Sequence, residues 1–181
     1  MKDRKRGIEM RKFISTANRG MGLENYINAA NTAYKLKKIA LIDKKPVPIK
    51  FRTDKRTGRI KEAWFEKQST VDYYGIVNGV PVAFECKSTR EETRFPLNNI
   101  EEHQYEYLRE FHLQKGVSFL LVEFAAHQEI YILKFEQLQQ WWFESRRGGR
   151  KSIPYKWFQE NCKKCGPGRG LSVDYLAAAG L

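Results

Sequence analysis

The chain has 181 residues, of which 41% are hydrophobic, and this is enough for one domain with a buried core. Its 33 Lys and Arg residues against 21 Asp and Glu residues give a formal net charge of +12, which favours a polyanionic partner such as nucleic acid. No apolar run approaches the roughly 18–20 residues that span a membrane, and no signal-peptide core follows the basic N-terminus, so we expect a soluble, cytoplasmic protein without a membrane partner.

The chain begins with a basic arm. Residues 1–18 carry many charges and little hydrophobic periodicity, so we interpret them as a flexible arm that either lies on phosphates or only aids solubility. Residues 19–181 form the single predicted domain. Its first element is a helix over 23–38, where apolar residues recur every three or four positions. Glu24 falls in the first turn, where the helix dipole favours a carboxylate. A catalytic role for Glu24 requires that this helix end faces the carboxylates described below.

The most basic segment of the chain is 50–61, which follows a short predicted strand over 39–42 and two prolines. Apolar residues flank a Thr57-Gly58 turn in this segment and predict a protruding hairpin. The hairpin is either a solvated charged surface or a finger that enters or braces nucleic acid.

The strongest chemical signal is the segment 69–87, S-T-V-D-Y-Y-G-I-V-N-G-V-P-V-A-F-E-C-K. Two strands joined by Asn78-Gly79 predict a tight hairpin, because this dipeptide readily adopts positive φ angles. Side chains alternate along a strand, so Glu85 and Lys87 point the same way and the cysteine between them points the other way. Asp72 starts the first strand and is expected to lie across from the end of the second.

Asp72, Glu85 and Lys87 together suit the hydrolysis of a phosphodiester. Mg²⁺ demands oxygen ligands, and two carboxylates side by side are costly to bury without a cation. We therefore expect Asp72 and Glu85 to hold Mg²⁺, with Mn²⁺ able to substitute, and Lys87 to orient water or stabilise the charged transition state. The alternative is an exposed strand with an ordinary ion pair, since E-x-K is common by chance.

The rest of the chain predicts alternating helices and strands. We expect a helix over 98–114, strands over 117–124 and 129–135, short helices over 136–144 and 154–161, and a terminal strand over 171–176. Cys162 and Cys165 have the spacing of half a zinc ribbon, but no second C-x-x-C exists, so we favour reduced thiols over a structural zinc. The element order predicts an α/β fold with a mixed central sheet and helices on both faces.

Together with motifs elsewhere in the chain, these residues make the sequence resemble the RecU family of Holliday junction resolvases, found in Gram-positive bacteria and their phages. The matching motifs are R-G-M-x-L-E at 19–24, K-x-P-x-P and E-A-x-F before residue 69, S-T-x-D-Y-x-G at 69–75, F-E-x-K at 84–87, F-P-L-x-N at 95–99, H-Q at 103–104, G-R-K-S-I at 149–153 and a terminal D-Y-L. They cover residues 19–176 in consistent order, and so many together are highly specific. Cys86 departs from the alanine usual in the family.

The resemblance implies a restriction-endonuclease-like core of the PD-(D/E)xK superfamily that works as a homodimer. It implies metal ligands at Thr70, Asp72, Glu85 and Gln104, and a transition-state-stabilising lysine at Lys87. The basic hairpin matches the family's stalk, at about 44–66 here, and the resemblance implies that it enters the centre of the four-way junction. The candidate DNA contacts are Arg19, Lys55, Arg56, Arg59 and Lys61.

The sequence therefore predicts a Mg²⁺-dependent, structure-selective endonuclease that nicks two opposed strands of a Holliday junction symmetrically, in homologous recombination and DNA repair. A two-fold dimer presents two identical sites, which suits this substrate. Four-way junction DNA is the expected partner, with RecA and a branch-migration complex as further candidates. Two alternatives stay open: another PD-(D/E)xK endonuclease that acts on duplex DNA, and a non-catalytic, junction-binding recombination accessory protein.

Overall fold

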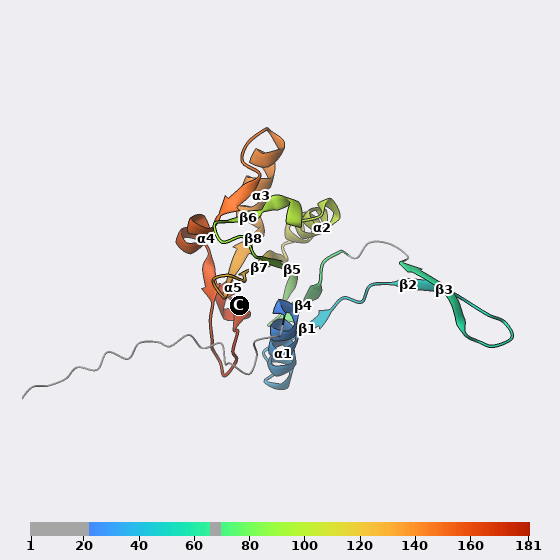
Figure 1. Ribbon diagram of the computed structural model, residues 1–181. Helices are drawn as coiled ribbons and strands as arrows, with labels where there is room; N and C mark the ends of the chain where they lie inside the picture. Colours follow the sequence, from blue (N-terminus) through green and yellow to red (C-terminus); the bar gives the residue numbers. More distant parts are fainter. Residues whose placement is uncertain (1–21, 66–69) are drawn as a thin grey trace, which may run out of the picture.

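A six-stranded sheet forms the centre of the protein in the computed structural model, which describes residues 22–65 and 70–181 (Figure 1). The strands are, in spatial order, β1 (Ala40–Lys44), β4 (Tyr73–Val77), β5 (Val80–Thr89), β7 (Val117–Phe124), β8 (Glu129–Lys134) and β10 (Lys163–Cys165). Within this sheet β5 and β7 run parallel, and the other neighbouring strands run antiparallel. The predicted mixed sheet is confirmed.

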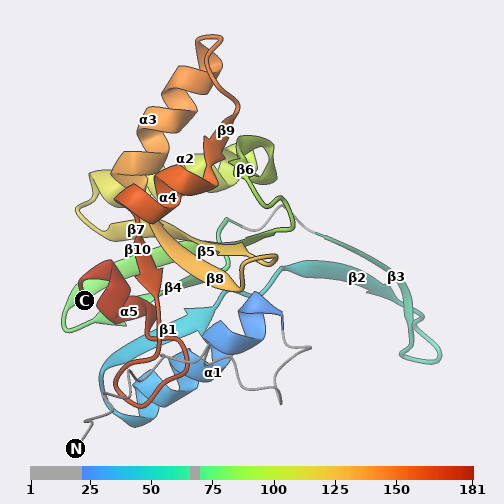
Figure 2. The same cartoon turned by 60° about the vertical axis from the view of Figure 1, so that its left-hand side comes forward.

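Helices cover both faces of the sheet, as the sequence predicts (Figures 1 and 2). One face is covered by α1 (Leu23–Leu36) and α5 (Tyr175–Ala179). The other face is covered by α2 (Glu102–Leu113), α3 (Phe135–Arg146) and α4 (Tyr155–Asn161). Because α2 links the parallel strands β5 and β7, it lies next to the end of β5, and this places its first turn near the segment singled out above.

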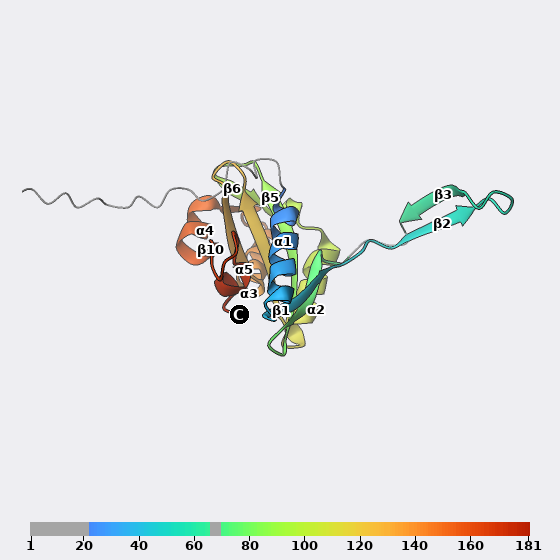
Figure 3. The same ribbon diagram turned by 90° about the horizontal axis from the view of Figure 1, so that it is seen from below.

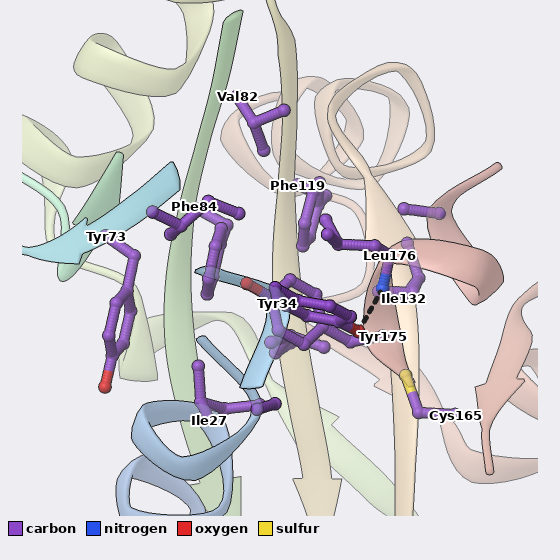
Figure 4. Packing of buried hydrophobic residues seen from close by; sticks show 14 of the residues in the cluster. Ile27, Tyr34, Tyr73, Val82, Phe84, Phe119, Ile132, Cys165, Tyr175 and Leu176 are labelled. Atoms are coloured by element: carbon purple, nitrogen blue, oxygen red, sulfur yellow. Dashed lines mark hydrogen bonds between the residues drawn. The ribbon is translucent and has the colours of Figure 1, made fainter. Parts of the chain in front are cut away.

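The core under α1 and α5 is built from stacked aromatic rings (Figure 4). Phe84 of β5 stacks between Tyr73 of β4 and Phe119 of β7, with ring centroids 4.9 Å apart in each pair. Tyr34 of α1 and Tyr175 of α5 pack against each other over this row. Aromatic pairs of this kind add about 0.5–1.5 kcal/mol beyond the burial of their area, so they fix β4 and β5 firmly relative to each other.

Strand β7 explains the long apolar run at 117–124. Phe119 and Leu121 point into the core under α1 and α5, whereas Leu120 and Val122 point into the core under α2, α3 and α4. A strand that is covered on both faces needs apolar side chains at successive positions, and the predicted buried strand is confirmed with its bounds.

A second, separate hairpin projects from the body of the protein (Figures 1 and 3). It consists of β2 (Ile49–Thr53) and β3 (Ile60–Phe65), and its described side chains are largely exposed. Asp54 fixes the turn, because its carboxylate accepts two backbone N–H groups of the loop at 2.8 and 3.0 Å. The predicted hairpin at 50–61 therefore forms.

The sequence placed the start of α2 too early. Residues 97–99 form a short 3₁₀ turn, η2 (Leu97–Asn99), and the α-helix begins only at Glu102. Glu101 is extended and serves as the N-cap, in a capping box with Gln104. Beside this turn, β6 (Arg94–Pro96) pairs with β9 (Ser152–Pro154).

The predicted terminal strand at 171–176 is wrong. The chain forms the short helix α5 instead, because the Asp174 side chain accepts the N–H of Ala177 and starts a helical turn. The sequence also did not predict β10, which completes the sheet. Cys165 of β10 is buried under α1 and α5, whereas Cys162 contacts the opposite core, so the two thiols lie on different faces of the sheet. This arrangement does not support a shared zinc ion.

No helix in the described ranges is long and apolar enough to cross a membrane.

Candidate active site

The β4–β5 hairpin places the predicted acidic residues at one edge of the sheet. Asn78 and Gly79 have φ angles of +48° and +82°, which the tight turn requires. The resulting register puts Tyr73 opposite Phe84, so Asp72 comes next to Glu85. The glycine of the S-T-x-D-Y-x-G motif also has a clear role: a Cβ at Gly75 would lie 2.1 Å from a backbone oxygen of β1, so no other residue lets β1 approach β4 this closely.

Asp72 and Glu85 hold each other through backbone hydrogen bonds. The N–H of Asp72 donates to Glu85 Oε2 at 2.9 Å, and the N–H of Cys86 donates to Asp72 Oδ2 at 3.0 Å. Each carboxylate is thus anchored on the strand that carries the other. The structure brings these two acids together as the sequence predicts.

The electrostatics of this pair are unfavourable in the absence of further positive charge. Glu85 is buried, with only 3% of its surface exposed. Burial, and then the charge of Asp72, raise the pKa of Glu85 to about 7. Burial also raises the pKa of Asp72. Two acids whose charged forms are both disfavoured make a site that gains from a cation.

Lys87 and Gln104 both contact the same oxygen of Glu85. Lys87 Nζ lies 3.0 Å from Glu85 Oε1, and Gln104 Nε2 donates to that oxygen at 2.5 Å. The side-chain oxygen of Gln104 accepts the N–H of Glu101 at 3.0 Å in the helix cap. Gln104 therefore positions Glu85 through its side-chain nitrogen. To bind a metal through its side-chain oxygen, Gln104 would have to break its hydrogen bond with Glu101.

Thr70 contacts a lysine that the sequence did not single out. Lys45 Nζ donates to Thr70 Oγ1 at 2.7 Å and lies 4.9 Å from the ring centroid of Tyr107. The backbone N–H of Lys45 also donates to the carbonyl of Asp72 at 2.7 Å. In the sequence, Lys45 is only a lysine directly before Pro46. Its role becomes visible through the contact with Thr70, which joins two segments that are distant in the chain.

The start of α1 faces this hairpin, which meets the geometric condition set for Glu24. The hydroxyl of Tyr73 donates to Asn28 Oδ1 at 2.8 Å and lies 3.4 Å from the carbonyl oxygen of Glu24, and the Glu24 carboxylate pairs with Lys44. After burial, the charge of Glu24 adds to the causes that raise the pKa of Asp72, while the charge of Lys44 acts in the opposite direction.

Four of the five candidate DNA contacts lie on the β2–β3 hairpin, which projects away from the central sheet (Figure 3). In the described part of the chain, Lys55, Arg56 and Arg59 at the hairpin tip have no ion-pair partner, whereas Lys61 lies 3.3 Å from Asp54. Arg19 and the arm 1–18 lie outside the described residues.

A divalent cation fits the acidic pair. Residues 22–65 and 70–181 contain no group of three or more His, Cys, Asp or Glu residues that suits a metal, so a cation here must draw on two carboxylates and on other oxygens. Asp72 Oδ1 accepts no hydrogen bond from the described residues and is free to bind one. Sheet and site together define a mixed α/β protein with an acidic, cation-compatible site of the kind that phosphodiester hydrolysis uses.

Comparison with known proteins identifies the family. The model of the family RecU, Recombination protein U, matches residues 18–180. Holliday junction resolvase RecU of Oceanobacillus iheyensis is 41% identical over 166 residues, which cover 90% of this chain and 85% of the relative. The proteins of the same name from Levilactobacillus brevis and Bacillus subtilis are 39% and 36% identical, over 92% and 90% of this chain and 87% and 80% of theirs. The chain belongs to the RecU family of Holliday junction resolvases.

Among solved structures, Hjc of Archaeoglobus fulgidus, a Holliday junction resolvase, aligns with a TM-score of 0.45 and 9% identity over 76% of this chain and 92% of that chain.

Proposed function

We propose that this RecU-family chain is a Mg²⁺-dependent, structure-selective endonuclease that resolves Holliday junctions by paired, symmetric nicks in recombination and DNA repair. The observation that carries the proposal is the Asp72–Glu85 pair, in which each carboxylate accepts a backbone N–H from the strand segment that holds the other acid. Lys87 Nζ lies 3.0 Å from Glu85 Oε1. The names of the relatives, Holliday junction resolvase RecU, support the choice of substrate.

In this proposal each site residue has one task. Asp72 and Glu85 hold the cation, with the hydroxyl of Thr70 as a further oxygen, and Mn²⁺ can replace Mg²⁺. The bound cation supplies an activated water and neutralises charge on the scissile phosphate. Gln104 keeps Glu85 oriented, and the Nζ of Lys87 donates a hydrogen bond to a phosphate oxygen or orients the attacking water.

The same proposal includes a restriction-endonuclease-like core and a two-fold homodimer. A dimer presents two identical sites to two equivalent strands, which symmetric nicking requires. RecA and a branch-migration complex are proposed as protein partners, on the strength of the family resemblance alone.

We further propose that the β2–β3 hairpin is a stalk that selects four-way junctions. Its tip carries Lys55, Arg56 and Arg59, which are exposed and unpaired among the described residues. Changing all three to Gln is expected to weaken junction binding about tenfold more than duplex binding, because only the junction has an open centre for a stalk to occupy. The matched control is Arg52→Gln, which removes a cation that Glu62 already pairs at 3.5 Å. Equal losses on both DNAs contradict the stalk.

One experiment tests the function as a whole. Four-way, three-way and linear DNA of the same sequence are incubated with the wild type and with Asp72→Asn, with and without Mg²⁺. The proposal expects cleavage of the four-way junction alone at appreciable rate, only with Mg²⁺ and only by the wild type. Equal cleavage of all three DNAs identifies a duplex endonuclease instead, and junction binding without any nicking identifies an accessory protein.

A further inference from the structure

A wide groove of about 1480 Å³ begins where the strand that carries Glu85 and Lys87 ends. One wall is formed by the end of β5 and the following segment, from Ser88 to Arg94. The other wall is formed by the end of α3 and the loop that leads into β9. Residues 96–100, which include η2, line it between these walls. We refer to this surface as the basic groove.

The charge of the basic groove is strongly positive. Two carboxylates line it, those of Glu91 and Glu92. The cationic side chains that line it number five: Arg90, Arg94, Arg146, Arg150 and Lys151. Two of the cations are paired, since Arg94 lies 3.4 Å from Glu91 and Arg146 contacts Glu102.

The other three cations, Arg90, Arg150 and Lys151, are exposed, and their side chains have no partner among the described residues. They stand on both walls of the groove, so their charges face the same space. Surface cations that a fold leaves unpaired along one groove are the usual footprint of a phosphate backbone.

The two walls are held together by backbone pairing. Strand β6 pairs with β9 in the register Phe95 opposite Ile153, and the N–H of Leu97 donates to the carbonyl of Lys151 at 3.1 Å. The N–H of Gly149 donates to the carbonyl of Glu144 at 2.9 Å and turns the loop back onto α3. The cations of the two walls therefore stand on a fixed backbone, so an anion that binds has to order only their side chains.

The groove begins at Ser88, one residue beyond Lys87 of the acidic site. Lys87 and Thr89 are two residues apart on β5, or about 7 Å along the strand. Gln104, which contacts Glu85, lies in the turn of α2 that follows the groove-lining Ile100. A nucleic acid strand with one phosphate at Glu85 and Lys87 thus reaches the groove with its neighbouring phosphates.

We propose that the basic groove binds the sugar-phosphate backbone of the substrate DNA on one side of the cleaved bond, with Arg90, Arg150 and Lys151 as its phosphate contacts. The inference rests on the proposed function, because it takes the cleaved bond to lie at Asp72 and Glu85. Backbone contacts carry affinity without reading sequence or junction shape. The groove is therefore expected to serve every duplex arm alike, in contrast to the hairpin tip.

The test measures binding without chemistry. Fluorescent four-way and linear DNA are titrated in EDTA at several salt concentrations with the wild type and with two groove variants, Arg150→Gln/Lys151→Gln from one wall and Arg90→Gln from the other. The control is Lys35→Gln/Lys163→Gln, which removes two exposed cations from the far end of α1 and from the edge strand β10. Thermal melting checks that every variant is folded.

The expected result follows from counterion release, which contributes a slope of about 0.9 in log Kd against log salt for each phosphate contact. The double groove variant is expected to lose about 1.8 of this slope on both DNAs, so the ratio of Kd at 200 mM to Kd at 50 mM salt falls about tenfold. Arg90→Gln is expected to lose about half as much slope. A slope equal to that of the control overturns the inference, as does a loss confined to the four-way junction.

Failure of the inference and failure of the proposed function give different results. If the groove variants bind like the control while the wild type still cuts junctions and Asp72→Asn does not, only the groove is wrong. If Asp72→Asn still cuts while the groove variants lose the expected slope, the groove binds DNA and the assigned reaction site is wrong.

Discussion

Glu85 and Asp174 are equally buried, each with 3% of its surface exposed, but their surroundings are opposite. Asp174 accepts two hydrogen bonds from Arg169, at 2.7 and 2.5 Å, and one from the hydroxyl of Tyr34 at 2.8 Å. The hydrogen bond from Arg169 is the main cause that lowers the pKa of Asp174. This carboxylate is fully supplied with donors and joins α1 to the C-terminal helix.

Glu85 stands next to a second carboxylate instead. Its donors are one lysine, one amide and one backbone N–H, and its pKa is raised to about 7 by burial and by Asp72. Burial of an acid therefore does not distinguish a structural role from a chemical one. The balance of donors does: Asp174 stabilises the fold, whereas the Asp72–Glu85 pair costs stability, which the cation of the proposed function would offset.

The largest expected difference between the two acids is in cleavage. Asp72→Asn is expected to lower the rate of junction nicking about 10³-fold, because it removes a charge aimed at the reacting phosphate and its cation. Asp174→Asn is expected to keep the wild-type rate per folded molecule, because Asp174 is the N-cap of α5 and contacts Arg169 and Tyr34, not the acidic site. Single-turnover cleavage at low temperature, with the folded fraction measured by circular dichroism, checks both. Similar losses in the two variants contradict the assignment of roles.

The two acids are also expected to respond oppositely to pH. In metal-free protein, folded Glu85 keeps its proton up to about pH 7, whereas the unfolded chain releases it near the ordinary value of 4.5. The free energy of unfolding of the wild type is thus expected to fall, relative to Glu85→Gln, by up to about 3 kcal/mol as pH rises from 4.5 to 7. For Asp174 the lowered pKa gives stability that is present above about pH 4 and is lost on further acidification.

Urea unfolding of both proteins in EDTA between pH 4.5 and 8 measures this difference. If the unfolding free energies of the wild type and of Glu85→Gln differ by the same amount at every pH in that range, Glu85 has its ordinary pKa. Its burial then has no electrostatic effect.

The loss of Asp174 is expected to cost about 2 kcal/mol of unfolding free energy at pH 7. Asp174→Asn leaves Arg169 without its charge partner and removes one of the two oxygens that accept its hydrogen bonds, although the partial exposure of Arg169 moderates the loss. Asp43→Asn is a matched control on β1, because Asp43 is exposed and has no ion-pair partner among the described residues. Its expected effect is within about 0.5 kcal/mol. Equal effects of the two changes in urea unfolding contradict the structural role of Asp174.

The difference between these regions also explains what the sequence could predict. The hairpin that carries Asp72 and Glu85 has a local code, an Asn-Gly turn and side chains that alternate, and it forms as predicted. The contacts of Thr70 with Lys45 and of Glu85 with Gln104 join positions 25 and 19 residues apart, and no local pattern encodes them. Gln104 entered the predicted site only through the family resemblance.

The C-terminal region was misread because its helix is shorter than the window over which periodicity is visible. The five residues of α5 include three alanines, and the apolar residues before them resemble a strand. What decides the helix is Asp174, whose donors come from α1 and from Arg169. A cap that depends on tertiary partners cannot be inferred from the segment alone.

The smallest effect expected here is the response to Mg²⁺, and it tests the two acids in one measurement. A cation that binds only the folded state at ten times its Kd raises the unfolding free energy by about 1.4 kcal/mol. The wild type and Asp174→Asn are expected to gain this increment at pH 8, whereas Asp72→Asn and Glu85→Gln are expected to gain none, because each loses one of the two carboxylates that hold the cation. Thermal melting with Mg²⁺, against Na⁺ at equal ionic strength, measures it. If Mg²⁺ raises the unfolding free energy of all four proteins equally, the cation binds elsewhere. No bound cation then offsets the cost of burying Glu85 beside Asp72.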